Sequence, residues 1–132
     1  MQVHNRIVAR FADGRIVKGT TRDFSVTREY FHVIPPAAEA PPVRVVIAAL
    51  KAVFFVKDHA GNRHYSEKKA FEKLVPGRKL QVIFKDGEIL VGATTAYDAA
   101  RPGFFVTPAD PKSNNDRIFV VAKAVRAVAF IQ

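Results

Sequence analysis

The chain has 132 residues, of which 48% are hydrophobic and 25% charged, so it fits one ordinary domain or two very small ones and is not disordered throughout. A formal net charge of +9 favours phosphate polymers or acidic surfaces as partners, and the absence of cysteine excludes disulfides and cysteine nucleophiles. No apolar signal core follows the first residues, and no run approaches the roughly 20 apolar residues of a membrane span. We therefore expect a cytoplasmic protein without a membrane partner.

The first predicted element is a hairpin. In residues 6–11, "RIVARF", apolar and polar side chains alternate, which is typical of a half-buried strand. Asp13-Gly14 follows, and Asp-Gly between two such runs indicates a hairpin with a type I′ turn, whose central residues both have positive φ. Gly19 lies within the second strand, where a glycine indicates a bend, a bulge or a close backbone approach.

Three further strands follow a polar loop. The run "YFHVIP" at 30–35 ends in a proline, which cannot donate a hydrogen bond within a sheet. The proline-rich stretch "PPAAEAPP" then predicts a stiff, solvated loop. The runs "VRVVI" at 43–47 and "KAVFFV" at 51–56 are separated by so few residues that we expect a single 3₁₀ turn between them.

A polar connector, residues 58–77, separates this part of the chain from the rest. Ser66 could cap a short helix over residues 67–74. An extended segment is the alternative, because the connector has no marked apolar periodicity.

The remainder of the chain repeats the first part. Residues 79–108 align with 6–35 without a gap, and residues 120–131 align with 45–56 after a two-residue shift. Gly92 thereby corresponds to the mid-strand glycine of the first part. We interpret the chain as a first repeat, a connector and a second repeat, at 1–57, 58–77 and 78–132.

The order of these elements resembles the Sm-like fold, a five-stranded SH3-like barrel. The stretch "VIFKDGEILVGATTAYD" is similar to the first Sm motif, with Gly92 at its bend glycine and Tyr97-Asp98 at its aromatic-Asp pair. The resemblance implies an all-β chain of two tandem five-stranded Sm-like small barrels, with RNA as the class of ligand.

The nucleotide pocket of that family does not transfer to this chain. In Sm and Hfq-type proteins an Asn follows the motif and a later Arg-Gly pair completes the pocket. The corresponding loops here, "SVTREYF" and "DAARPGFF", lack the Asn, and "ALKAV" and "AVRAV" stand where Arg-Gly is expected. Any RNA binding would therefore use other residues.

Catalytic and metal sites are not indicated. His59 and His64 share the connector with Asp58, but their spacing matches no common pattern of metal ligands. Asp13 and Asp86 could be interpreted as an acid pair across the repeats, but the role of each in an Asp-Gly turn already explains it. None of the serines lies in a nucleophile elbow. We predict no enzyme, no metal and no cofactor.

A cyclic di-GMP receptor of the PilZ type is a further hypothesis. Asp23-x-Ser25 resembles part of the PilZ signature, and Arg6 and Arg10 lie near the start of the chain, as its paired arginines would. Arg28, however, stands where that signature has a glycine. Hydrogen bonding within a loop is the alternative role for Asp23 and Ser25.

Six basic residues are candidate ligand-binding residues. Arg28 recurs as Arg101 at the same loop position, and a guanidinium group suits phosphate or carboxylate and also stacks on aromatic rings. The other four lie on equivalent faces of the first strand of each repeat, and they are Arg6, Arg10, Lys79 and Lys85.

Two functions remain open besides the PilZ hypothesis. The first is a non-catalytic module that binds RNA or another polyanion through this basic surface. The second is a protein-interaction or assembly module, in which unpaired barrel edges join copies of the chain to one another.

Overall fold

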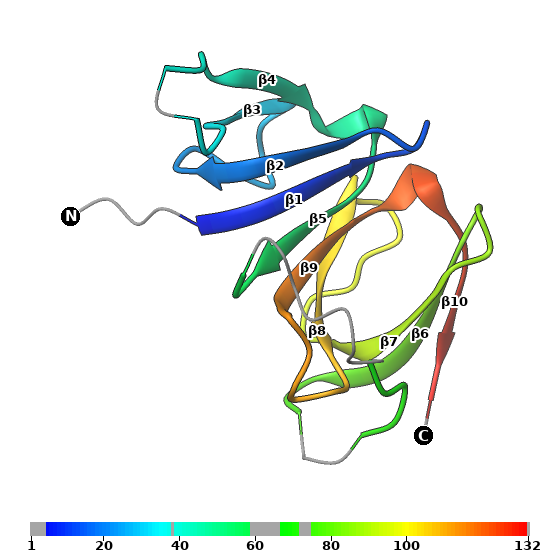
Figure 1. The fold of residues 1–132 in the computed structure, drawn as a ribbon. Helices are drawn as coiled ribbons and strands as arrows, with labels where there is room; N and C mark the ends of the chain where they lie inside the picture. Colours follow the sequence, from blue (N-terminus) through cyan, green and yellow to red (C-terminus); the bar gives the residue numbers. More distant parts are fainter. Residues whose placement is uncertain (1–4, 38, 59–66, 72–74, 132) are drawn as a thin grey trace.

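The computed structural model describes residues 5–37, 39–58, 67–71 and 75–131, and nearly all of its regular structure is β-strand (Figure 1). The all-β fold class is therefore confirmed. The first half contains β1 (Asn5–Phe11), β2 (Ile16–Thr21), β3 (Tyr30–Val33), β4 (Val43–Val46), the 3₁₀ turn η1 (Ile47–Ala49) and β5 (Leu50–Val56). The second half contains β6 (Arg78–Phe84), β7 (Ile89–Thr94), β8 (Gly103–Pro108), β9 (Asn115–Val121), the 3₁₀ turn η2 (Ala122–Ala124) and β10 (Val125–Phe130).

The strands form one open antiparallel sheet with the order β10-β6-β7-β8-β9-β5-β1-β2, and a separate two-stranded sheet of β3 and β4. The prediction of two tandem closed barrels is therefore wrong. The physical reason lies in β5, which pairs with β1 on one side and with β9 of the other half on its second side. In Figure 1 the green β5 and the orange β9 run side by side between the two halves.

Strands at corresponding positions of the two halves pair in the same register. Phe31 pairs with Val45 in the first half, and Phe104 pairs with Val120 in the second. The offset is 73 residues before the loop (104 − 31) and 75 residues after it (120 − 45). These two offsets define which residues we call equivalent below.

The hairpin over the Asp-Gly pair is confirmed, but its turn type differs from the prediction. Gly14 has φ of 98°, whereas no described residue other than glycine has a positive φ, so Asp13 does not adopt the type I′ conformation. The Gly14 amide donates to the Phe11 carbonyl (3.1 Å), and the Phe11 amide donates to the Arg15 carbonyl (2.9 Å). This is a three-residue loop closed by a left-handed glycine. Asp13 Oδ1 accepts from the Arg15 amide, as turn chemistry predicts.

The two mid-strand glycines mark close backbone approaches, as predicted. A Cβ atom on Gly19 would lie 2.2 Å from the Ile34 carbonyl oxygen, and one on Gly92 would lie 2.2 Å from that of Thr107. The space they leave lets β2 cross the chain after β3, and lets β7 pair with β8. Only glycine fits at either position.

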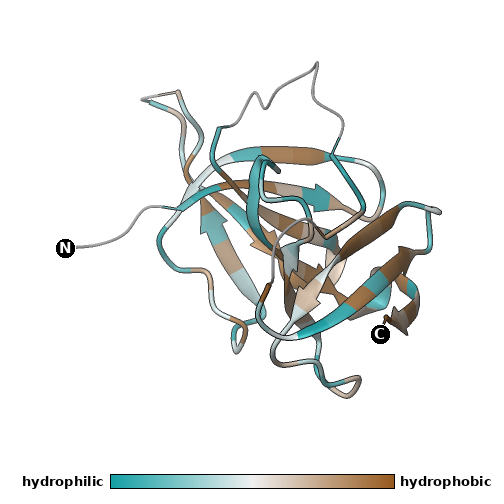
Figure 2. Cartoon of the chain, turned by 90° about the horizontal axis from the view of Figure 1, so that it is seen from below, coloured by the Kyte–Doolittle hydropathy of each residue, from teal (hydrophilic) through white to brown (hydrophobic). Residues whose placement is uncertain are grey.

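Two hydrophobic clusters form the core, and each contains residues of both halves. The first cluster consists mainly of first-half residues but includes Phe119 and Val121 of β9. The second consists mainly of second-half residues but includes Ala52 of β5. Figure 2 shows hydrophobic residues concentrated on the strands that face these clusters. The β5–β9 pair therefore links the two halves through their cores as well as through backbone pairing.

The remaining expectations concern turns and the connector. The 3₁₀ turn expected between the last two strands of the first half is confirmed as η1, and η2 occupies the equivalent place. Residues 67–71 are not helical, and residues 72–74, the rest of the proposed helix, lie outside the described residues. Within the described chain, no helix has the length and apolar character needed to cross a bilayer.

Candidate functional site

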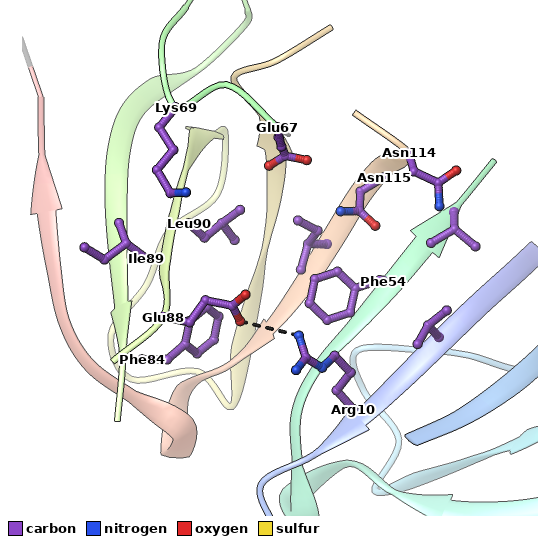
Figure 3. Close-up of a pocket in the computed structure, with 13 residues that line it drawn as sticks. Arg10, Phe54, Glu67, Lys69, Phe84, Glu88, Ile89, Leu90, Asn114 and Asn115 are labelled. Atoms are coloured by element: carbon purple, nitrogen blue, oxygen red, sulfur yellow. Dashed lines mark ion pairs between the residues drawn. The ribbon is translucent and has the colours of Figure 1, made fainter. Parts of the chain in front are cut away.

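A polar cleft of about 350 Å³ lies between the two halves (Figure 3). Figure 3 shows the side chains of Arg10 from β1 and Glu88 from the β6–β7 turn pointing toward each other, and their closest N–O distance is 3.5 Å. The Arg10 guanidinium also lies 5.9 Å from the centre of the Phe54 ring. The cleft is lined by Val8, Arg10, Phe54, Val56, Glu67, Lys69, Phe84, Glu88, Ile89, Leu90, Asn114, Asn115 and Ile118.

The charges of this cleft balance. Its two cationic side chains, Arg10 and Lys69, face two acidic ones, Glu67 and Glu88. Glu67 accepts a hydrogen bond from the buried Ser113 hydroxyl and is thus part of the connector's attachment to the second half. The cleft therefore offers no net attraction to a polyanion.

A second cavity, of about 570 Å³, gathers equivalent residues of both halves. We call it the arginine groove. It lies between the β2–β3 loop, the β7–β8 loop and the two 3₁₀ turns, so that Arg28 and its equivalent Arg101 both line it, as do Val46 and its equivalent Val121. The groove is lined by Val26, Thr27, Arg28, Glu29, Val46, Ile47, Ala48, Ala100, Arg101, Pro102, Val121, Ala122 and Lys123.

The arginine groove is cationic. Within the described chain, Arg28 and Lys123 have no side-chain hydrogen bond or ion pair. Arg101 lies 3.7 Å from Asp98 across an exposed contact, with 66% of its side chain accessible. Glu29 is the single acid among the lining residues. With Asp98 counted, three cations stand beside two acids, so the groove carries a small excess of positive charge.

The lining between these charges is aliphatic. Val26 is 47% exposed and Val46 is 44% exposed, although both are hydrophobic. Exposed apolar side chains rimmed by charged ones are typical of an interaction site.

The other four candidate residues lie in separate surroundings. Arg6 donates to the Lys57 carbonyl (2.8 Å), and Arg10 faces Glu88 in the polar cleft. Lys79 places its ammonium 4.9 Å from the Phe71 ring centre. Lys85 lines a smaller cavity that adjoins the arginine groove through Lys123.

The loop residues behind the PilZ hypothesis hydrogen-bond locally. Asp23 accepts from the His32 amide (2.9 Å) and contacts His32 Nδ1 at 2.7 Å. Burial raises the pKa of Asp23, but hydrogen bonds from the His32 ring, the His32 amide and Thr21 outweigh it, and the net pKa is lowered. Ser25 contacts the Thr27 hydroxyl at 2.8 Å. Binding of cyclic di-GMP remains an untested prediction.

Sequence reasoning identified Arg28 and Arg101 but missed the residues that surround them. Val46 and Lys123 belong to runs that the sequence indicated only as strand and turn. The repeat alignment contained the signal, because Val46 is equivalent to Val121 and Ala48 to Lys123. The histidines of the connector, His59 and His64, lie outside the described residues.

The chain belongs to a family of unknown function (DUF6982), whose model matches residues 3–132. This is not an Sm or Hfq family, so the proposed membership of the Sm-like family is wrong. No curated protein and no solved structure matches the chain significantly.

Proposed function

We propose that this chain is a non-catalytic interaction module whose arginine groove binds an acidic segment of a partner protein. The observation that carries the proposal is that Arg28 and Arg101, which are 73 residues apart in the chain (101 − 28), line the same groove. Guanidinium groups bind carboxylates through paired hydrogen bonds. Lys123 adds a third cation on the same rim.

The aliphatic lining favours a peptide over a nucleic acid. Val26 and Val46, both exposed, can cover the apolar side chains of an extended peptide whose acidic residues reach the arginines. Single-stranded RNA is instead bound by stacking its bases on aromatic rings. The groove's lining residues include no aromatic side chain.

RNA is the second candidate ligand, and the net charge of +9 favours it. Lys85, adjacent to the groove, would extend its positive surface along a phosphate backbone. A nucleic acid ligand would bind with a steep dependence on salt and with no need for the apolar lining.

Fluorescence anisotropy with three probes tests the proposal. The probes are a labelled peptide of alternating Glu and Leu, the same peptide with Lys for Glu, and labelled poly(U). We expect the Glu-Leu peptide alone to bind. The double variant Arg28→Ala/Arg101→Ala should weaken that binding by about 10- to 100-fold, as the loss of charged hydrogen bonds predicts.

A matched control removes two exposed positive charges outside the groove, in the variant Arg15→Ala/Lys112→Ala. It should leave peptide binding within about twofold, because exposed charges contribute little at a distance. If the control variant loses as much affinity as the groove variant, net charge and not the groove accounts for binding. Binding of poly(U) without the peptide would overturn the proposal in favour of RNA.

A further inference from the structure

In the described structure the larger sheet ends at β10 and β2, and the smaller sheet consists of β3 and β4. Thr20 in β2 bridges to Ile34 directly after β3, so β2 and β3 lie against each other, whereas β4 and β10 each have a free edge. β4 pairs only with β3, and β10 pairs only with β6, among the strands that the structure describes. An edge strand presents backbone N–H and C=O groups that a further strand can pair with. Figure 1 places β4 and the red β10 on opposite sides of the molecule.

The edge strand β10 ends in exposed apolar residues whose equivalents in β5 are buried. Phe130 is 38% exposed and Ile131 is 42% exposed. Their equivalents in the first half, Phe55 and Val56, are 4% and 7% exposed because β9 covers them. Figure 2 shows hydrophobic colour on the strand next to the C-terminus.

The edge at β4 shows the same difference. Val43 is 37% exposed and Val46 is 44% exposed. Their equivalents in the second half, Ile118 and Val121, are 0% and 2% exposed because β5 covers that side of β9. Each free edge therefore lacks the partner that its equivalent has within the chain.

We propose that β10 of one copy pairs with β4 of a second copy, in the register that β5 and β9 use within the chain. Within the chain Ala52 pairs with Val120, Val53 with Phe119 and Phe54 with Ile118. The 75-residue offset converts these pairs into Ala127 with Val45, Val128 with Arg44 and Ala129 with Val43. The contact joins two different surfaces, so it is head-to-tail and builds a closed ring or an open filament.

The backbone hydrogen bonds fit this register. The Ile131 amide donates to Lys79 in β6, and the Ile47 amide donates to Glu29 next to β3. The backbone N–H and C=O groups of successive residues point to opposite sides of a strand. Val128, three residues before Ile131, and Arg44, three residues before Ile47, therefore turn these groups to the free edges of β10 and β4. The proposed register places these two residues opposite each other, as a hydrogen-bonded pair requires.

The ion pairs of the β5–β9 contact have no full counterpart here. Within the chain, Lys51 of β5 pairs with Asp86 and Glu88 of the β6–β7 turn. Their equivalents are Arg126 (51 + 75), Asp13 (86 − 73) and Arg15 (88 − 73), and Arg15 already pairs with Asp13 at 2.8 Å. The proposed contact therefore rests on the register and on the exposed apolar edges. The edge at β4 adjoins the arginine groove, because Val46 belongs to both, but the proposal does not depend on the ligand of the groove.

Cysteine cross-linking tests the register directly, because the chain has no cysteine of its own. Ala129 and Val43 would form a non-hydrogen-bonded pair, with Cα atoms about 4.5 Å apart, which a disulfide can span. We mix Val43→Cys chains with Ala129→Cys chains under mild oxidation. A disulfide-linked pair of chains is expected, and a mixture of Val43→Cys with Lys112→Cys should give at least about tenfold less.

Sedimentation velocity over a range of concentrations tests the association itself. The natural chain is expected to self-associate, and Val43→Lys to weaken the association about tenfold by placing a charge against the apolar Ala129 of the next copy. Ile16→Lys makes a similar change at another exposed apolar residue and should leave the association unchanged. Circular dichroism checks that each variant folds.

Three results would overturn the proposal. The first is a monomer at every concentration up to the millimolar range. The second is association that Val43→Lys and Ile16→Lys weaken equally. The third is cross-linking of Val43→Cys with Lys112→Cys as efficient as with Ala129→Cys.

Discussion

The Lys51 ammonium lies 2.7 Å from Asp86 Oδ2, and this contact ties β5 of the first half to the β6–β7 turn of the second. Only 6% of the Lys51 side chain is exposed, against 53% for Asp86. The ammonium also donates to Glu88 and lies 4.7 Å from the Phe84 ring centre. A buried cation of one half is thus neutralised entirely by groups of the other half.

Replacing Lys51 by methionine removes this cation while keeping most of the apolar stem. We expect Lys51→Met to lower the free energy of unfolding by about 1 to 3 kcal/mol, since charged hydrogen bonds are lost but both acids stay partly solvated. Guanidinium denaturation measures the change. Lys112→Met, at an exposed loop position, should change it by less than about 0.5 kcal/mol. An undiminished stability of Lys51→Met would show that the contact contributes nothing net.

The same contact predicts a dependence of stability on pH. A hydrogen bond from the Lys51 ammonium, followed by one from the Glu88 amide, lowers the pKa of Asp86 below its ordinary value of 3.8. The unfolded chain therefore takes up this proton first. The stabilisation from Asp86 is fully present above the unfolded pKa, and it is lost as the pH falls through the lower folded pKa.

A double-mutant comparison isolates this effect from the other carboxylates. The stability difference between the natural chain and Asp86→Asn should be largest near neutral pH and should shrink as the pH falls below the ordinary carboxyl value of 3.8. In the Lys51→Met background the difference should be smaller and flatter. An Asp86→Asn difference that is equally large at low pH would contradict the assignment.

The sequence predicted the local elements because their causes are local. Asp-Gly pairs indicated both hairpins, mid-strand glycines indicated both close approaches, and short spacings indicated both 3₁₀ turns. The turn type was wrong because Asp13-Gly14 fits a type I′ turn and also a three-residue loop with one left-handed glycine.

The arrangement of the halves could not be predicted for a different reason. The runs that become β5 and β10 are similar, and those that become β4 and β9 both end in Val-Val. The differences between them, such as Arg44 where β9 has Phe119, are local and do not state which strand of the other half pairs with β5. Val46 is exposed, and so can line the arginine groove, because β9 and not β4 pairs with β5. Its exposure could therefore not be predicted from the sequence.

The close backbone approach at Gly19 predicts that even a substitution by alanine is strongly destabilising. An added methyl group would lie 2.2 Å from the Ile34 carbonyl oxygen and 2.8 Å from Val33, so the backbone itself must shift. We expect Gly19→Ala to lower the free energy of unfolding by about 2 to 4 kcal/mol. Thermal denaturation followed by circular dichroism measures it.

Gly14→Ala is the comparison for that substitution. Gly14 has a positive φ of 98° but open space around its Cα, so the cost there is conformational strain of about 1 kcal/mol. Equal losses for Gly14→Ala and Gly19→Ala would show that the chain after β3 moves away from β2 easily.

The packing of the Phe24 ring against aromatic rings of both halves predicts that the two halves unfold together. Its ring centre lies 5.0 Å from that of Phe31 and 5.4 Å from that of Phe55 in the first half. It also lies 5.3 Å from Phe119 and 6.2 Å from Phe105 in the second. We expect Phe24→Ala to lower the free energy of unfolding by about 2 to 4 kcal/mol.

Because the cluster around Phe24 spans both halves, the loss should appear as a single transition at a lower denaturant concentration, with far-UV and near-UV signals coinciding. The equivalent residue Tyr97 contacts Phe104 and Phe130 of its own half, so Tyr97→Ala should weaken that half alone. The far-UV and near-UV transitions should therefore separate for Tyr97→Ala and coincide for Phe24→Ala. The opposite result, separate transitions for Phe24→Ala and coinciding ones for Tyr97→Ala, would mean that the β5–β9 pairing, and not the aromatic cluster, couples the halves.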